Sequence, residues 1–236
     1  MASLLVDTDE HEEHDDHADH AHHRVNGVMH QYEDIDQQNE SYAVGMWTFL
    51  VTEVMFFGGM FGGYTVYRNM YPEAFASTSH FMNVTIGAIN TGVLIFSSFT
   101  MVLAVRSAQL GQKKALIAFL ILTLILGCVF LSLKYVEYHE KWVDHHIPGP
   151  GFHYADPRYF HQAQILFFLY FAMTGMHAIH MIVGAGLLAA LIVMAVRNRF
   201  SATWYTPVEM IGLYWHFVDI VWIFLFPLLY LIGHTR

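Results

Sequence analysis

The chain has 236 residues, of which 55% are hydrophobic and only 13% are charged. A soluble domain usually carries about twice that charged fraction, so the composition excludes an ordinary soluble protein and indicates one surrounded by lipid. The formal net charge of −9 comes from the first 40 residues, which hold twelve acidic residues and one basic residue. The remainder is nearly neutral, and we expect no nucleic-acid partner.

Residues 1–42 form an acidic, histidine-rich tail that contains the run HEEHDDHADHAHHR and very few hydrophobic residues. Such a segment cannot bury enough apolar surface to offset the entropy lost on ordering, so we expect it to be disordered. It also lacks the pattern of a signal peptide. Histidines among carboxylates are typical of weak zinc or copper sites, although a solvated tail with incidental metal affinity is the favoured interpretation. The candidate ligands are His11, His14, His17 and His20.

Hydrophobic runs long enough to cross a bilayer, which takes about 20 helical residues, follow the tail. There are five, at about residues 43–66, 84–105, 115–135, 163–196 and 208–232. Residues 43–236 are therefore predicted to be an all-α domain, a polytopic membrane helix bundle of five transmembrane helices. The single cysteine, Cys128, excludes an internal disulfide and a metal cluster framed by cysteines.

Basic residues in short loops predict the orientation of the chain, because such loops stay in the cytoplasm. Arg106, Lys113 and Lys114 lie in one short loop, and Arg197 and Arg199 lie in another on the same side as the N-terminus. We therefore expect a cytoplasmic N-terminus and a C-terminus on the outer side.

Glu53 lies inside the first hydrophobic run and has no basic residue within one helical turn. An ionisable group at that depth is costly unless it is paired, so we expect a protonated carboxyl and a specific role. Two interpretations stay open. Glu53 is either a carboxyl that exchanges protons or a structural carboxyl held by hydrogen bonds.

Small residues predict where a partner subunit packs, because helix association in lipid depends on close backbone approach. Two overlapping glycine pairs follow Glu53, and the second run carries a polar segment. Together they predict an exposed partner surface around residues 58–63 and 97–100. The glycines are Gly58, Gly59, Gly62 and Gly63.

Other polar residues inside the hydrophobic runs predict an interhelical network. His177 and His180 are spaced by three on one helix, and Asp219 follows His216 by one turn, so that these two can pair locally. Such a set can lock helices together, relay protons or hold a partner subunit, and the first interpretation is favoured. The candidate residues are Asn90, His177, His180, Glu209, His216 and Asp219. Three histidines in the membrane are too few for a haem–copper centre, so we expect no metal there.

The hydrophobic runs also carry distinctive motifs. They are GMWTFLVTEVMFFGG, INTGVLIFSSFTMVLA, EYHE, FFLYFAMTGMHAIHMIVG and LYWHFVDIVWIFLFPLLYL, in this order. Over roughly residues 43–233 they make the chain similar to the cytochrome c oxidase subunit III family. The chain lacks the first two helices of that family's seven-helix form and resembles its shorter, five-helix bacterial form.

This resemblance implies a V-shaped arrangement of helices with bound phospholipid in the cleft. It implies a chain without catalytic residues or a redox centre, accessory to a proton-pumping haem–copper terminal oxidase of a bacterial inner membrane. That complex is an oxidoreductase and translocase of aerobic respiration, which passes electrons from cytochrome c or a quinol to O2. Haem and copper are then expected in catalytic subunit I and its partner subunit II, within a complex that can join a respiratory supercomplex. Glu53 would be the family's buried carboxylate, and the chain would stabilise subunit I and support proton uptake.

Two alternatives to an oxidase subunit remain open. One is an accessory protein of nitric oxide reductase within the same family. The other is a stand-alone proton or metal transporter that uses Glu53, the histidines of the fourth run and the tail. Inverted repeats and paired broken helices, which are typical of transporters, are absent from the sequence.

Overall fold

A computed structural model describes Tyr32 and residues 34–79, 82–149, 152, 154, 157–200 and 204–231. The chain divides into a short unit, residues 1–41, and a main unit, residues 42–236. The tail candidates His11, His14, His17 and His20 lie outside the described residues, so metal affinity stays a prediction, as does disorder of the tail before Ile35, where a helix begins.

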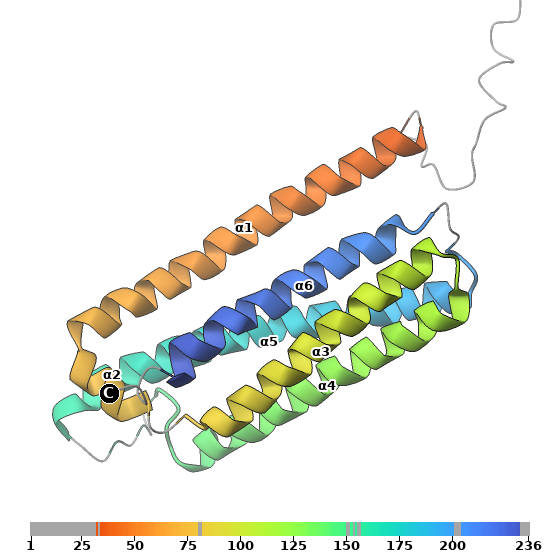
Figure 1. Ribbon diagram of the computed structural model, residues 1–236. Helices are drawn as coiled ribbons and strands as arrows, with labels where there is room; N and C mark the ends of the chain where they lie inside the picture. Colours follow the sequence, from red (N-terminus) through yellow and green to blue (C-terminus); the bar gives the residue numbers. More distant parts are fainter. Residues whose placement is uncertain are drawn as a thin grey trace, which may run out of the picture. The chain divides into compact units, whose positions relative to one another are not determined.

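The described chain is helical and contains no strand (Figure 1). Among these residues, five helices are long and apolar enough to cross a membrane, which confirms the predicted all-α polytopic bundle. The V-shaped arrangement stays a prediction. In chain order the elements are α1 (Ile35–Met70), α2 (Pro72–Ser79), α3 (Val84–Gln109), α4 (Lys113–Val143), the 3₁₀ turn η2 (Pro157–Tyr159), α5 (Phe160–Val196), α6 (Thr206–Phe226) and the π-helix η3 (Pro227–Leu231).

The helix boundaries differ from the predicted runs where polar residues continue a helix. The first helix begins at Ile35 rather than near Ala43, and α4 runs on to Val143 instead of ending near residue 135. With 37 residues, α5 is about 55 Å long, well over the hydrocarbon thickness of about 30 Å. Hydropathy marks the membrane-crossing part of a helix, whereas the helix itself ends where its backbone can be capped.

Capping and turn residues mark three of the helix ends. The Asn83 side chain accepts a hydrogen bond from the Ile86 N–H at 3.3 Å and so begins α3. Gly111, whose φ is 67°, provides the left-handed residue that the tight turn between α3 and α4 requires. Pro207 lies in the first turn of α6, where no backbone N–H is needed.

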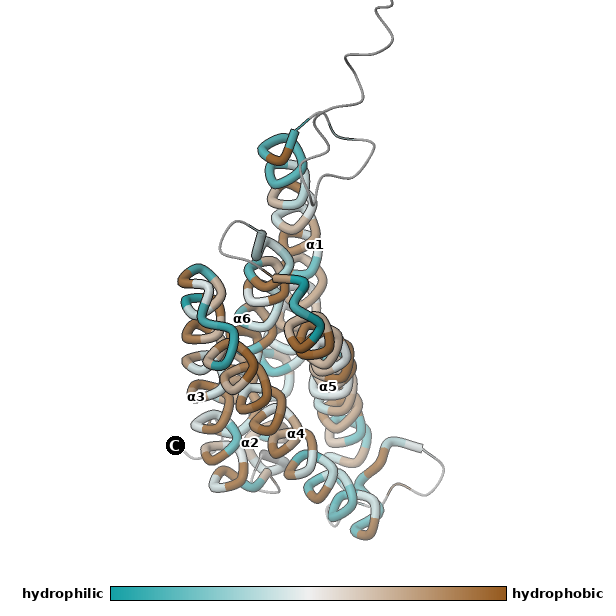
Figure 2. The backbone as a smooth tube through the Cα atoms, turned by 90° about the vertical axis from the view of Figure 1, so that its right-hand side faces the viewer, coloured by the Kyte–Doolittle hydropathy of each residue, from teal (hydrophilic) through white to brown (hydrophobic). Residues whose placement is uncertain are grey.

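Helices α3, α4, α5 and α6 pack side by side, each next to its neighbour in sequence, and α3 also lies against α6. Figure 2 shows mostly hydrophobic residues along the middle of α4 and α5. Small residues allow the close contacts: the Trp215 ring of α6 lies against Gly127 of α4 and Gly184 of α5. Trp215 is fully buried, so the three helices are closely packed at this layer.

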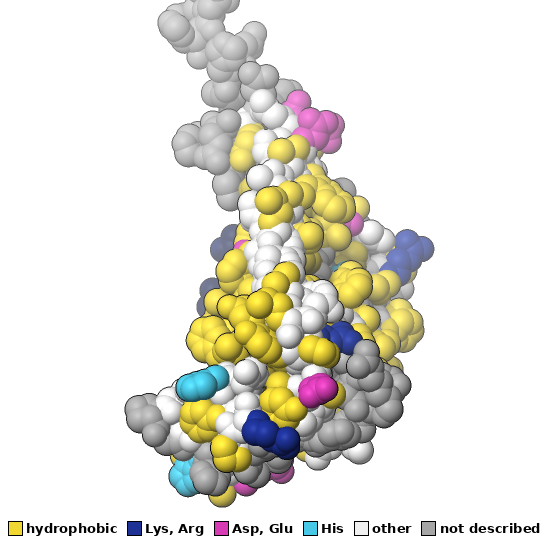
Figure 3. All heavy atoms as spheres, turned by 90° about the vertical axis from the view of Figure 1, so that its left-hand side faces the viewer, with side chains coloured by type: hydrophobic (Ala, Val, Ile, Leu, Met, Phe, Trp, Pro, Cys, Tyr) yellow, Lys and Arg dark blue, Asp and Glu magenta, His cyan; other side chains and the backbone are white. Residues whose placement is uncertain are grey.

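Helix α1 is much less buried than the others. In its most apolar stretch of 18 residues only 11% is buried, compared with 28–44% of the corresponding stretches in the other membrane-crossing helices described. Phe57 and Tyr64 pack inward, whereas Trp47, Val51 and Met55 are exposed. Hydrophobic side chains cover much of the face shown in Figure 3. An outer surface of this composition is stable against lipid or another apolar helix.

Candidate functional site

Glu53 of α1 is paired across the bundle with His180 of α5. The Glu53 Oε2 and His180 Nε2 atoms are 3.1 Å apart, and the two side chains are 19% and 14% exposed. His180 Nδ1 lies 2.9 Å from the Met176 carbonyl oxygen, and Phe57 packs edge-on against the imidazole. The sequence showed no base within a turn of Glu53, and the partner comes instead from another helix.

The Glu53–His180 pair borders a cavity of about 340 Å³ between α1, α5 and α6. Tyr214 of α6 lines it as well, and its hydroxyl donates to the His180 carbonyl oxygen at 2.9 Å. The rest of the lining is apolar: Met46, Phe49, Ile179, Val183, Leu187 and Ile211. The cavity therefore provides a low-dielectric approach to a carboxyl and an imidazole that already share a hydrogen bond.

His177 lies one turn before His180 but has a different environment. It is fully buried between Phe130 and Trp222, with ring centroids 5.5 and 5.2 Å away. Neither of its ring nitrogens has a hydrogen-bond partner in the described part of the chain. The two histidines thus share a helix without sharing a site.

The polar residues of α6 bond to α3 rather than to one another. Glu209 accepts a hydrogen bond from the Gln109 amide at 3.0 Å, and His216 Nδ1 is 2.7 Å from the Ser98 hydroxyl. Asp219 is buried, and the predicted Asp219–His216 pair is not formed. The antiparallel register of the two helices places Ser98 beside His216 and gives that histidine a closer partner.

Asn90 completes the predicted set. It is fully buried in α3, and neither atom of its amide has a partner among the described residues. The six candidates therefore do not form one continuous hydrogen-bonded network across α3, α5 and α6.

The predicted partner surface divides into an open part and a buried part. A Cβ atom added at Gly58, Gly59, Gly62 or Gly63 would meet no described atom within 4 Å. Ser97 and Thr100 instead face inward, where Ser97 accepts from the Trp215 indole at 3.0 Å and Thr100 bonds to Thr123 at 2.8 Å. The prediction was wrong for these two residues, because their hydroxyls join helices within the chain.

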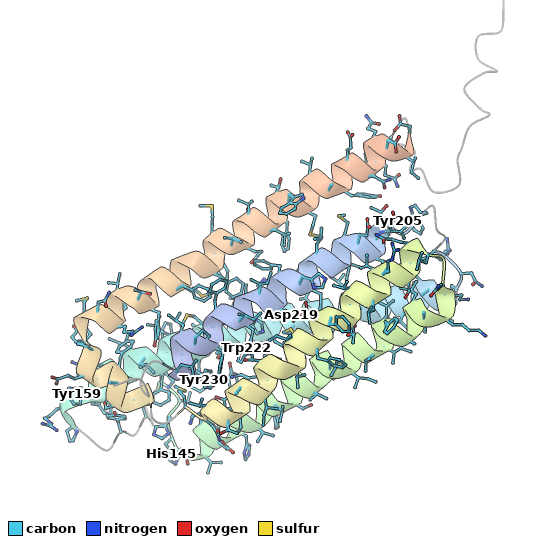
Figure 4. The ribbon with its side chains drawn as sticks, in the orientation of Figure 1. His145, Tyr159, Tyr205, Asp219, Trp222 and Tyr230 are labelled. Atoms are coloured by element: carbon cyan, nitrogen blue, oxygen red, sulfur yellow. The ribbon has the colours of Figure 1, made fainter. Side chains whose placement is uncertain are left out.

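A buried ion pair that sequence reasoning missed joins α4, α5 and η3. Lys134 Nζ lies 2.8 Å from Glu137 Oε2, and both side chains are almost fully buried. Glu137 Oε1 accepts from the Tyr170 and Tyr230 hydroxyls at 2.8 and 2.6 Å. Figure 4 labels Tyr230 and the nearby Trp222, whose ring lies 5.1 Å from Lys134 Nζ. We refer to Lys134, Glu137, Tyr170 and Tyr230 as the Lys134 cluster.

The Lys134 cluster follows the period of the buried residues along α4. Its α4 members continue the buried stripe of that helix at spacings of three and four, after Thr123, Gly127 and Phe130. A stripe that continues with the same period predicts burial of its polar members too.

No three His, Cys, Asp or Glu side chains among the residues described come close enough to hold a metal ion.

Comparisons with known proteins agree with this architecture. The family model of cytochrome c oxidase subunit III matches residues 29–234. Subunit 3 of the cytochrome bo(3) ubiquinol oxidase of Pseudomonas aeruginosa is 30% identical over 208 residues, or 87% of this chain and 92% of that protein. Cytochrome c oxidase subunit 3 of Corynebacterium diphtheriae is 30% identical over 80% of this chain and 87% of its own length. The corresponding subunit of Latimeria chalumnae is 30% identical over 81% of this chain and 69% of its own length. The chain is therefore an integral membrane protein that belongs to the cytochrome c oxidase subunit III family.

Proposed function

We propose that this chain is a non-catalytic accessory subunit of a proton-pumping haem–copper terminal oxidase. It stabilises the catalytic subunit and supports proton uptake. Its relatives include subunits of a ubiquinol oxidase and of cytochrome c oxidases, so the electron donor is a quinol or cytochrome c. Haem and copper belong to partner subunits I and II, and phospholipid occupies the cleft of the V-shaped arrangement. The complex lies in a bacterial inner membrane, with the N-terminus of this chain in the cytoplasm.

The observation that supports the proton-uptake role is the contact between Glu53 and His180 beside the cavity. A carbonyl oxygen can only accept, so His180 Nδ1, which lies 2.9 Å from the Met176 oxygen, bears a hydrogen. The 3.1 Å contact from Nε2 to Glu53 then needs one further proton, on either the carboxyl or the imidazole. Such a pair beside a cavity can take up and release a proton while keeping an internal hydrogen bond.

Purification of the complex tests the proposed function. The chain, tagged and extracted in mild detergent, should bring down haem- and copper-containing subunits with the optical spectrum of a terminal oxidase. A nitric oxide reductase partner would support the first alternative instead. A chain recovered alone that moves protons or metal ions across vesicles would support the transporter alternative.

The exposed face of α1 supplies a prediction about the partner surface. Gly59→Leu should lower recovery of the catalytic subunit severalfold, because a bulky side chain prevents close approach of a partner helix. Gly186→Leu on α5 is the matched control, since this glycine also has open space around it among the described atoms. Equal recovery of the partner with both variants, measured by quantitative mass spectrometry, contradicts the assignment of this surface.

Substitution of Glu53 separates proton exchange from structure. Glu53→Gln keeps the shape and the hydrogen bond to His180 Nε2, so we expect normal assembly. It cannot hold an exchangeable acidic proton, so turnover and proton pumping should fall severalfold, most strongly at high pH, where protons are scarce. Glu53→Ala leaves His180 Nε2 without a partner, which costs about 1–3 kcal/mol.

The readouts for Glu53 are subunit content and pumped protons per electron in reconstituted vesicles. Normal pumping by Glu53→Gln across the pH range contradicts the proton-uptake role. A nearly silent Glu53→Gln together with poor assembly of Glu53→Ala would assign Glu53 a structural role instead.

A further inference from the structure

A second polar site lies between α3 and α6, separate from the Glu53–His180 pair. A groove of about 430 Å³ runs between these helices. Arg106, Gln109 and Glu209 line it near the end of α3 and the start of α6, and His216 lines it further along α6. Its walls are otherwise apolar, from Val102, Val105, Met210, Gly212 and Leu213. The groove therefore connects a charged mouth with an imidazole inside the membrane-crossing segment.

Behind His216 lies a carboxyl group that the groove does not reach. Asp219 is only 3% exposed, and Figure 4 labels it on the stretch of α6 that runs beside α3. The Asp219 carboxyl approaches the Ser98 hydroxyl. That hydroxyl is engaged with His216 Nδ1 at 2.7 Å, and both Asp219 oxygens lack a partner of normal geometry among the described residues.

Neighbouring contacts fix this arrangement firmly. The Trp215 indole donates to Ser97 at 3.0 Å, and the Trp222 indole donates to Thr91 at 3.1 Å. These two hydrogen bonds flank the Ser98–His216 contact and set the antiparallel register of α3 and α6. Ser98 is thereby held between an imidazole that lines the groove and a buried carboxyl.

An unpaired buried carboxylate is too costly to persist in an apolar interior unless it gains a proton or a partner. We infer that Asp219, Ser98 and His216 form a proton-exchange site that is supplied through the α3–α6 groove. Water in the groove gives a proton to His216 Nε2, and the Nδ1–H passes its proton to the Ser98 oxygen. The Ser98 hydroxyl proton moves to the Asp219 carboxylate. The sum is transfer of one proton from groove water to Asp219, and reversal of these steps releases it.

This site differs from the Glu53 site in its access. Tyr214 lines the cavity beside Glu53, whereas His216 lines the groove beside α3. The charged side chains that line the groove are Arg106 and Glu209, and Glu209 is held by the Gln109 amide. The inference concerns residues of this chain alone, so it does not depend on the partner subunits proposed above.

Infrared spectroscopy of the complex purified with this chain tests the inference without turnover. A protonated carboxyl gives a carbonyl stretch that shifts in D2O, and the band that Asp219→Asn removes belongs to Asp219. In the wild type this band should shift rapidly after transfer to D2O. Ser98→Ala and His216→Phe should slow the shift by about tenfold or more, since each interrupts the relay.

Two controls keep the outcome clear. Ser98→Thr retains a hydroxyl and should restore rapid exchange, whereas Glu53→Gln should leave the Asp219 band unchanged because it lies at the other site. Wild-type exchange rates in both Ser98→Ala and His216→Phe would overturn the inference. Slow exchange in Ser98→Thr, or the absence of any Asp219-dependent band, would overturn it as well. A particle that lacks haem would refute the proposed function and leave this measurement intact.

Discussion

Replacing Lys134 by methionine should destabilise the chain by about 3–5 kcal/mol, the loss typical of a buried ion pair deprived of one member. Methionine keeps the volume of the stem but leaves the Glu137 carboxylate with only the Tyr170 and Tyr230 hydroxyls. Both members of the pair are almost fully buried, so water does not replace the lost ammonium. The measurement is the free energy of unfolding of the purified chain in mixed detergent micelles with rising denaturing detergent.

A double variant distinguishes the ion pair from simple packing. Lys134→Met with Glu137→Gln removes both charges and keeps an amide oxygen for the two phenols, so it should recover most of the lost stability. Lys114→Met at an exposed position should change stability little. A single variant within about 1 kcal/mol of wild type, or a double variant no better than the single one, contradicts this account.

Gly184→Ala should be the second strongly destabilising substitution. The added Cβ would lie 2.9 Å from Trp215 Cζ3 and 3.2 Å from Tyr214 Cε1. The indole has little freedom to move, because its N–H is bonded to Ser97 and Gly127 closes on its other edge. Overpacking of this kind typically costs about 1–3 kcal/mol. The same unfolding measurement provides the test.

Gly186→Ala supplies the matched control on the same helix, since no described atom lies within 4 Å of its added Cβ. We expect its stability to match the wild type. Adding Trp215→Phe to Gly184→Ala should recover part of the loss by removing the crowded ring. Equal stability of the Gly184→Ala and Gly186→Ala chains would show that the layer around Trp215 is not tightly packed.

Membrane-crossing segments were predictable because hydrophobic length is a local property of the sequence. Each of the five predicted runs corresponds to one of the membrane-crossing helices that the structure describes. The early start of α1 at Ile35 and the short helix α2 were missed, since their polar residues carry no hydrophobic signal. Helix continuation beyond the bilayer depends on capping and packing rather than on hydropathy.

Partners of individual side chains were much less predictable than segments. The sequence singled out Glu53 as an unusual residue, yet its partner His180 lies on a different helix, far along the chain. Spacing within one helix suggested an Asp219–His216 pair. The register between α3 and α6 instead places the Ser98 hydroxyl against His216 Nδ1. Such choices depend on distances between helices, which a single sequence does not contain.

The Lys134 cluster has a consequence for biogenesis. Tyr230 leaves the ribosome after α4 and α5, so Glu137 must wait for a late segment before it gains its second phenol. Until then Lys134 and Glu137, spaced by three on one helix, can neutralise each other during insertion of α4. Arrival of η3 then closes the site and brings in the hydroxyl that completes it. A nascent chain stalled before Tyr230 would display an incompletely satisfied charge pair, a feature that membrane quality control could recognise.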